Sequence, residues 1–416
     1  MPSHEPAASG VAGVPAASQA SPAARDEPPR DRYAGPEILR QGFRPFFLAA
    51  SVWAVIAVAL WLPVFQGQIG LPTEFDPLAW HAHEMIFGFV AASVAGFLLT
   101  AIPNWTGRLP LRGLPLLGLF CVWLAGRVAI LASAEIGAAA ATVIDLAFLP
   151  LLVGFALREI VAGRNWRNLP VVIAVTALFA ANALMHAEAL GWITTGGIGP
   201  RLGIAIVTLM ISLIGGRIIP SFTRNWLAKR GDGSLPVPFG RYDGLCILLV
   251  LVAVAGWTFV PDTLPVAVLL LLAGIASLVR LWRWKWYRTL SEPLIWSLHL
   301  GFLWVPLGLL LLGASRFVAS VPLSAGLHAL TAGAAGSMIL AVMTRATLGH
   351  TGRELSSDHA TTAIYLLVFA AAALRVSASF LPSADPLLIA SAVAWIAAFL
   401  LFAIHYVPIL VSARDS

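Results

Sequence analysis

Apolar stretches of about 20 residues, each long enough to cross ~30 Å of hydrocarbon as a helix, recur from Phe43 to Leu410 with short polar breaks between them. Helix is the expected form, because backbone groups surrounded by lipid must hydrogen-bond within their own segment. Only 11% of the residues are charged, which is too few to cover the surface of a soluble protein of this length. The sequence therefore predicts an all-α, polytopic transmembrane bundle.

Short turns containing Gly and Pro divide the apolar sequence into about twelve predicted spans. These spans are 44–64, 79–102, 114–133, 138–158, 169–190, 201–220, 243–260, 263–281, 292–313, 321–347, 361–381 and 386–410. They make residues 41–416 a single transmembrane domain. Residues 1–40 are rich in Ala, Pro and Ser and contain several charges, so we expect them to form a disordered cytoplasmic tail.

The basic residues orient the predicted spans. With the N-terminus in the cytoplasm, Arg201 and Arg316 fall on the outer side, Arg127 and Arg375 lie within spans, and every other one of the 26 Lys and Arg residues falls on the cytoplasmic side. This bias predicts a multi-pass inner-membrane protein with both termini in the cytoplasm. The sequence pI of about 9.9 therefore reflects topology and contact with anionic membrane lipid, not nucleic-acid binding.

The tenth predicted span carries small residues four positions apart. Gly333 and Ser337 form one such row, and Ala332 and Gly336 form another. Rows of small residues let helix backbones approach one another closely. We therefore expect this helix to lie at the centre of the bundle.

Two charged residues, Arg127 and Asp145, fall inside consecutive spans that are joined by a short outer turn near Glu135. Charges at membrane depth are costly and require a partner. Counted from the turn at 1.5 Å per residue, the two side chains reach similar depths. The sequence predicts a buried ion pair that closes this hairpin, and a proton-linked or ligand-linked role is the alternative.

The histidines are the most informative polar residues. Four of them share one outer level of the predicted bundle: His81, His83, His186 and His328. Neutral imidazole is a ligand suited to copper and to haem iron. Glu84 follows His83 directly and is expected beside the metal, because a ligating His needs an acceptor for its other ring N–H. Spacing alone thus predicts a metal or haem site that uses some of this outer set.

Helix geometry limits which histidines can share one ion. His328 and His350 are separated by about 33 Å on a continuous helix, so they cannot ligate the same metal. His81 and His83 are about 200° apart on an ideal helix. They converge on one ion only if the helix begins after His81, and otherwise they face different partners.

Arginines at the inner ends of the spans form a second set: Arg44, Arg108, Arg167, Arg217, Arg224, Arg345 and Arg353. The positive-inside pattern accounts for them without any further function. The alternative is that a few of them, with Arg44, Arg217 and Arg345 as candidates, bind haem propionates or lipid headgroups through charge-assisted hydrogen bonds.

Several motifs in the same order as in a known family extend over the chain after its tail. They are Gly42–Phe47, Trp80–Met85, Pro103–Arg108, Asn165–Pro170, Gly215–Trp226, His328–Thr331 and Met343–Arg353. Together they resemble the NnrS family of bacterial membrane proteins. The resemblance implies a twelve-span inner-membrane protein containing haem b and copper. It also implies a link to denitrification, to the nitric oxide response and to nitrosative stress.

The same resemblance implies candidate cofactor ligands. These are His81, His83, His328 and His350, with His299 as a further candidate. Since His350 lies on the side opposite the other three, two separate sites are expected. Nitric oxide is the implied small-molecule ligand, and an electron donor of unknown kind is a possible partner. Whether nitric oxide is bound or consumed, and therefore whether the protein is an enzyme, stays open.

Two other functions fit a chain with about twelve spans. A haem–copper oxidase or nitric oxide reductase subunit would also have intramembrane histidines, but this chain lacks the adjacent His-His pair of that family. A secondary transporter would fit the span count and the predicted topology. Transporters of that kind usually show a repeat between their halves, and no motif is shared between residues 41–220 and 243–410.

Overall fold

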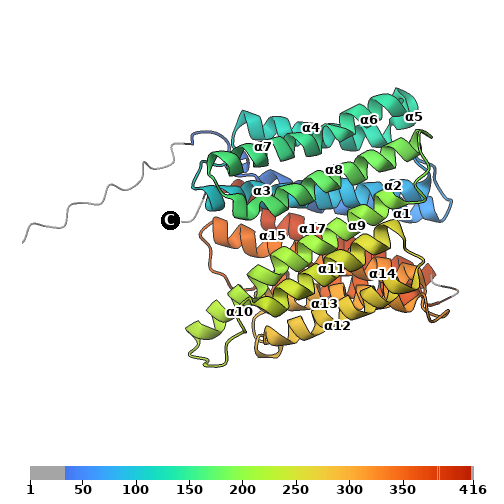
Figure 1. The fold of residues 1–416 in the computed structure, drawn as a ribbon. Helices are drawn as coiled ribbons and strands as arrows, with labels where there is room; N and C mark the ends of the chain where they lie inside the picture. Colours follow the sequence, from blue (N-terminus) through green and yellow to red (C-terminus); the bar gives the residue numbers. More distant parts are fainter. Residues whose placement is uncertain (1–32, 382, 384, 414–416) are drawn as a thin grey trace, which may run out of the picture. The chain divides into compact units, whose positions relative to one another are not determined.

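The computed structural model describes residues 33–381, 383 and 385–413, and the described residues from Gly35 onward form an all-helical unit (Figure 1). Within them, twelve helical segments are long and apolar enough to cross a membrane. Both findings confirm the prediction of a twelve-span all-α protein. Of the predicted tail, residues 1–32 lie outside the described residues, and Glu37–Leu39 form a short 3-10 helix, η1.

Several spans consist of more than one helical element. In chain order the spans are α1 (Phe43–Phe65); α2 (Pro77–His83), η2 (Glu84–Val90) and α3 (Ala91–Thr106); α4 (Leu114–Leu131); α6 (Ala138–Leu146) and α7 (Phe148–Ala162); η3 (Trp166–Asn168) and α8 (Leu169–Ala189); α9 (Ile198–Met210), η4 (Ile211–Gly215) and α10 (Gly216–Lys229); α11 (Arg241–Phe259); α12 (Leu264–Arg283) and η5 (Trp286–Arg288); α13 (Pro293–Ala314); α14 (Leu323–His328), η6 (Ala329–Gly336) and α15 (Ser337–His350); α16 (His359–Ala378); and α17 (Asp385–Val411). A short helix, α5 (Ser133–Ile136), joins the third span to the fourth.

The sixth span is longer than the sequence predicts. Its predicted end at residue 220 is wrong, because α10 continues to Lys229. Along α10, Ile219, Thr223 and Leu227 are buried at four-residue spacing while basic residues occupy other faces. An amphipathic helix of this kind stays helical after its sequence has ceased to be uniformly apolar. Hydropathy alone therefore placed the boundary too early.

The first and last spans pack against each other, α1 against α17, and α16 packs along α17. The second and tenth spans are among the most enclosed, with 78% and 67% of their apolar windows buried. In the tenth span, Cβ atoms added at Gly333 and Gly336 would lie 2.6 and 2.5 Å from the indoles of Trp304 and Trp395. The small residues thus allow close packing of this helix, as predicted.

Three elements of the described chain are π-helices: η2, η4 and η6. They fall in the second, sixth and tenth spans, so a π segment recurs at every fourth span. π-helical turns are rare and are frequently found at functional sites. In two of the three, a backbone carbonyl accepts a hydrogen bond from a side chain of another helix. Trp123 Nε1 donates to the Gly88 carbonyl in η2 at 3.0 Å, and Arg280 donates to the Ser212 carbonyl in η4 at 2.8 Å.

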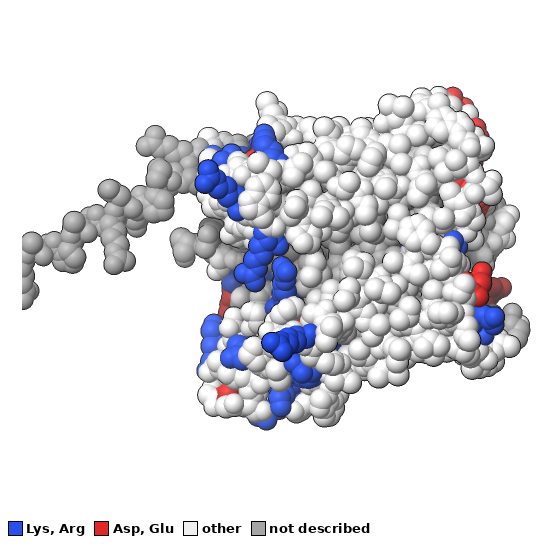
Figure 2. Space-filling model, viewed as in Figure 1, with Lys and Arg blue, Asp and Glu red and all other residues white. Residues whose placement is uncertain are grey.

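Charged side chains are segregated along the helix axes. On the face drawn in Figure 2, Lys and Arg gather at one end of the helices, where α10 lies in Figure 1, and most of the visible Asp and Glu lie at the other end. The wide surface between the two ends is almost free of charge on this face. This distribution suits a chain whose middle portion is surrounded by hydrocarbon.

Candidate metal centre

The start of the second span decides how its two histidines are presented. Asp76 caps α2, because its carboxylate accepts hydrogen bonds from the backbone N–H groups of Leu78 and Ala79, both at 3.0 Å. Pro77 occupies the first helical position, which suits its fixed backbone. The helix is therefore already formed at His81, and His81 and His83 face different neighbours.

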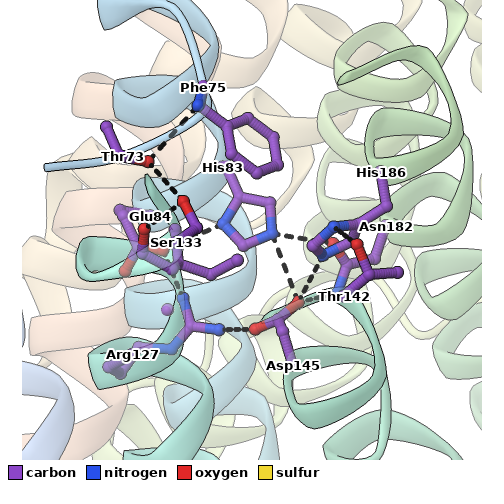
Figure 3. A network of polar contacts seen from close by, with 12 residues as sticks. Thr73, Phe75, His83, Glu84, Arg127, Ser133, Thr142, Asp145, Asn182 and His186 are labelled. Atoms are coloured by element: carbon purple, nitrogen blue, oxygen red, sulfur yellow. Dashed lines mark hydrogen bonds and ion pairs between the residues drawn. The ribbon is translucent and has the colours of Figure 1, made fainter. Parts of the chain in front are cut away.

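His83 is fully buried and bonds through both ring nitrogens (Figure 3). Its Nδ1 lies 2.9 Å from Glu84 Oε1, and its Nε2 lies 2.9 Å from Asn182 Oδ1 and 3.3 Å from Asp145 Oδ2. The same Asp145 oxygen lies 2.9 Å from Nε2 of His186. The carboxylate of Asp145 thus lies between two imidazoles that come from the second and fifth spans.

Three buried side chains of this cluster can hold a metal ion: His83, Asp145 and His186. One ligand atom from each lies within 4.8 Å of the others. Two imidazoles with a carboxylate form a nitrogen and oxygen donor set that suits copper, zinc or ferrous iron. Metal bonds of about 2.0–2.2 Å place ligand atoms about 3–3.5 Å apart, close to the 3.3 and 2.9 Å that separate Asp145 Oδ2 from Nε2 of His83 and Nε2 of His186.

The charge of the cluster also favours a cation. Arg127 donates through NH1 to Glu84 Oε1 at 2.7 Å and through NH2 to Asp145 Oδ1. The structure thus places Arg127 and Asp145 in direct contact at 3% and 2% exposure. One guanidinium faces two carboxylates, and Oε2 of Glu84 has no hydrogen-bond partner. Without a metal, a protonated His83, which faces oxygens of Glu84, Asn182 and Asp145, balances the second carboxylate, and a metal ion would take the place of that proton.

The comparison with protein families covers nearly all of the described chain. The model of the family described as NnrS protein matches residues 37–414. The chain belongs to the NnrS family. No curated protein matches the chain. The match spans all twelve transmembrane segments, and so the family resemblance predicted from the sequence motifs is confirmed.

Two polar residues that bond the candidate metal ligands of this NnrS protein were not predicted from its sequence. Thr142 Oγ1 lies 3.0 Å from His186 Nδ1, and Asn182 Nδ2 donates to Asp145 Oδ2 at 2.8 Å. Asp145 was predicted as the partner of Arg127, with a proton-linked or ligand-linked role as the alternative, and it was not among the predicted metal ligands. One feature of the sequence could have predicted part of this cluster: Asn182 lies one helical turn before His186, so both side chains fall on the same face of the helix.

His81 belongs to a second group. Its ring stacks on Trp61 with centroids 4.3 Å apart and an interplanar angle of 13°, and its buried Nδ1 has no partner. His328 lies within electrostatic range of His81. The Nδ1 of His328 is 2.8 Å from the Ser324 carbonyl. As the donor in that hydrogen bond, His328 presents its Nε2 for ligation, the arrangement common in metal-ligating histidines.

The other candidate histidines of this NnrS protein lie elsewhere. The Nε2 of His299 is 2.9 Å from Thr223 Oγ1 in α10, and its Nδ1 has no partner. His350 ends α15, at the opposite end of its span from His328, and its ring lies 5.7 Å from that of Phe43. The structure does not bring either residue into the cluster around His83.

The candidate arginines have separate partners. Arg44 is buried and donates through NH1 to the carbonyls of Leu410 and Ser412, both at 2.7 Å, so it bonds the last carbonyls of α17. Arg345 lies over the Phe222 ring, 4.1 Å from the centroid. Arg217 is exposed. A propionate bound by Arg44 would have to replace these backbone contacts.

Proposed function

We propose that this NnrS protein binds a redox metal in a bacterial inner membrane and acts in the response to nitric oxide, by binding or turning over nitric oxide at a histidine-ligated centre. The convergence of His83 Nε2, Asp145 Oδ2 and His186 Nε2 is the observation that carries the proposal. Copper is the proposed occupant, because its affinity for nitrogen and oxygen donor sets exceeds that of the other common divalent metals.

The surrounding side chains prepare the two imidazoles for a metal. Glu84 accepts the Nδ1–H of His83, and Thr142 accepts that of His186, so each ring can give up the proton on its Nε2 to bind a metal through that nitrogen. Such partners orient ligating rings and raise their basicity. The ring of Phe75 packs 5.1 Å from that of His83 and 5.5 Å from that of His186, which limits access of water. A copper ion in this position would supply a site for nitric oxide or for an electron.

A separate haem b site is proposed at His81 and His328. The unpartnered Nδ1 of His81 and the available Nε2 of His328 are the nitrogens that would hold the haem. Trp61, stacked on His81, would have to move when haem binds. Haem held by one of these two histidines would supply an iron that can bind nitric oxide.

The proposed membrane orientation follows from the charge distribution. The ends of the helices rich in arginine face the cytoplasm and its anionic lipid under the positive-inside rule. The copper centre then lies toward the outer side, since His83 is close to the start of the second span. Turnover of nitric oxide at this centre would also need an electron donor.

Metal analysis of the purified protein tests this function. Copper and iron are counted, and absorption spectra are recorded with and without nitric oxide, for the wild type, His83→Ala, His186→Ala and the control His359→Ala, which changes an exposed histidine. We expect near-stoichiometric copper in the wild type and the control, and loss of copper in the other two. A folded wild type that binds neither metal when both are supplied contradicts the proposal, and substrate-driven counterflow in vesicles would then favour a transporter.

A further inference from the structure

A cavity of about 100 Å³ lies between the second, sixth and tenth spans. Apart from Phe47 of α1, its walls come from these three spans. Each of the three π-helices contributes to the lining: Val90 from η2, Gly215 from η4 and Ala335 from η6. The three π-helices of the described chain therefore meet around one cavity.

The walls offer nothing to a polar or charged ligand. Ser93 is the one lining residue with a polar side chain, and its hydroxyl donates to the carbonyl of Phe89 at 3.0 Å. Every other lining side chain is aliphatic, aromatic or methionine. An ion, a headgroup or a substrate with hydrogen-bonding groups would lose its hydration here without compensation. The occupant must therefore be apolar.

The volume limits the size of that occupant. An apolar cavity of about 150 Å³ stays dry and accepts xenon or benzene. The present cavity is smaller, at about 100 Å³. A molecule that lies wholly inside it is therefore no larger than a single rare-gas atom or one or two diatomic molecules, and a porphyrin cannot lie within it.

The cavity has a mouth within the membrane-spanning region. Its floor residues, such as Val207 and Met338, are buried, while Val94, Ile211 and Ile214 at the rim are half-buried. These rim residues belong to α3 and η4, within the second and sixth spans. The surface that the mouth faces is apolar. Small apolar molecules concentrate in such surroundings rather than in water.

We propose that this cavity binds small apolar gas molecules that enter from the hydrocarbon of the bilayer. Identifying the physiological gas as nitric oxide rests on the proposed function. Val90 of the cavity wall follows His83 by seven residues on one continuous span, which is about 10 Å along the axis. A molecule held here is close to the candidate metal centre, and Phe87, whose ring contacts that of His83, lies between them in sequence.

Xenon tests the cavity directly. Crystals of the full chain grown in lipid are pressurised with xenon, and anomalous scattering locates the bound atoms. The test variant Val207→Phe fills the cavity from α9, and the matched control Val393→Phe makes the same change at a position of α17 that is 59% exposed. We expect xenon in the cavity of the wild type and the control, and its loss in Val207→Phe.

A second variant covers the case in which Val207→Phe does not fold. A Cβ at Gly215 would meet its nearest neighbours at 3.6 Å, an ordinary contact distance, so Gly215→Ala narrows the cavity without a clash. Reduced xenon occupancy in Gly215→Ala supports the proposal. An empty cavity, or density for a lipid acyl chain in it, overturns the proposal. Xenon binding requires no metal, and therefore a protein that binds xenon but no metal refutes only the assignment of nitric oxide.

Discussion

Trp123 Nε1 donates a hydrogen bond to the carbonyl oxygen of Gly88 at 3.0 Å, in the middle of π-helix η2. A π turn displaces the usual helical pairing of nearby carbonyls, and an inserted side-chain donor is one way to satisfy them. Trp123 lies on α4, so the third span supports the segment that begins with Glu84, one residue after His83. The geometry of the candidate metal centre therefore depends on a tryptophan that does not belong to it.

Trp123→Phe keeps most of the ring and removes the donor. A buried carbonyl without its partner costs about 1–3 kcal/mol, so we expect the free energy of unfolding to fall by that amount and copper affinity to fall with it. Denaturant unfolding and copper titration measure the two effects. The control Trp192→Phe changes a residue that is 72% exposed and should alter neither. Equal values for both variants would contradict the assigned role of Trp123.

Gly88 itself is predicted to resist substitution. A Cβ there would lie 2.5 Å from Trp53 Nε1 and 3.0 Å from NH1 of Arg127. We expect Gly88→Ala to lower stability by about 1–3 kcal/mol through overpacking and to displace Arg127 from its carboxylates. Gly118→Ala, where a Cβ meets nothing within 4 Å, should be neutral or stabilising by up to about 1 kcal/mol through helix propensity. Thermal unfolding of the two variants checks the difference, and similar unfolding temperatures would count against the crowding.

The transmembrane fold can be predicted from the sequence because the length and hydropathy of a segment determine whether it spans the membrane. They also determine how deep in the membrane each residue lies, and for this reason Arg127 and Asp145 were predicted to lie at the same depth on their two helices. Depth does not reveal which way a helix is rotated, and so the position of Asp145 between two imidazoles was not predicted. The start of α2 was predictable, since Asp76 and Pro77 form a recognised helix-start signal. This signal predicts that the helix is already formed at His81, and therefore that His81 and His83 face different neighbours.

The π-helices could not be predicted in this way. They depend on contacts between spans, such as the bond from Arg280 to the Ser212 carbonyl, and no local propensity encodes such contacts. Their recurrence at every fourth span is visible only once the helices are assigned. A search for similarity between two halves of the chain cannot detect a period of four spans.

The balance of charge around Arg127 gives a third prediction. Arg127→Met leaves Glu84 and Asp145 buried without their cation, and breaking a buried pair from one side costs about 3–5 kcal/mol. The double variant Arg127→Met with Glu84→Gln removes one of the two carboxylate charges and should recover part of this loss. Unfolding of the metal-free proteins measures both. A double variant no more stable than Arg127→Met would show that charge is not the cause.

The last prediction concerns pH and a carboxylate outside the spans. Asp358 caps α16, accepting the Thr361 N–H at 2.7 Å, and its other oxygen lies 2.8 Å from His405 Nε2. Partial burial raises the pKa of Asp358, but the hydrogen bonds from Thr361 and the neighbouring His405 lower it more, so the pKa lies below its ordinary value. The charge of Asp358 therefore stabilises the fold above about pH 4, the pKa of an unfolded Asp, and that stabilisation is lost as pH falls through the lowered value.

Asp358→Asn isolates this charge, because Asn is also a good helix cap. We expect the variant to be less stable than the wild type at pH 7 by under about 1 kcal/mol, since the Asp358 side chain is 55% exposed. The difference should vanish at a pH below the lowered pKa, where the wild type is protonated as well. Unfolding curves at both pH values provide the measurement. A difference that persists unchanged at low pH would mean that the substituted amide caps α16 less well than the carboxyl group, and that charge contributes nothing.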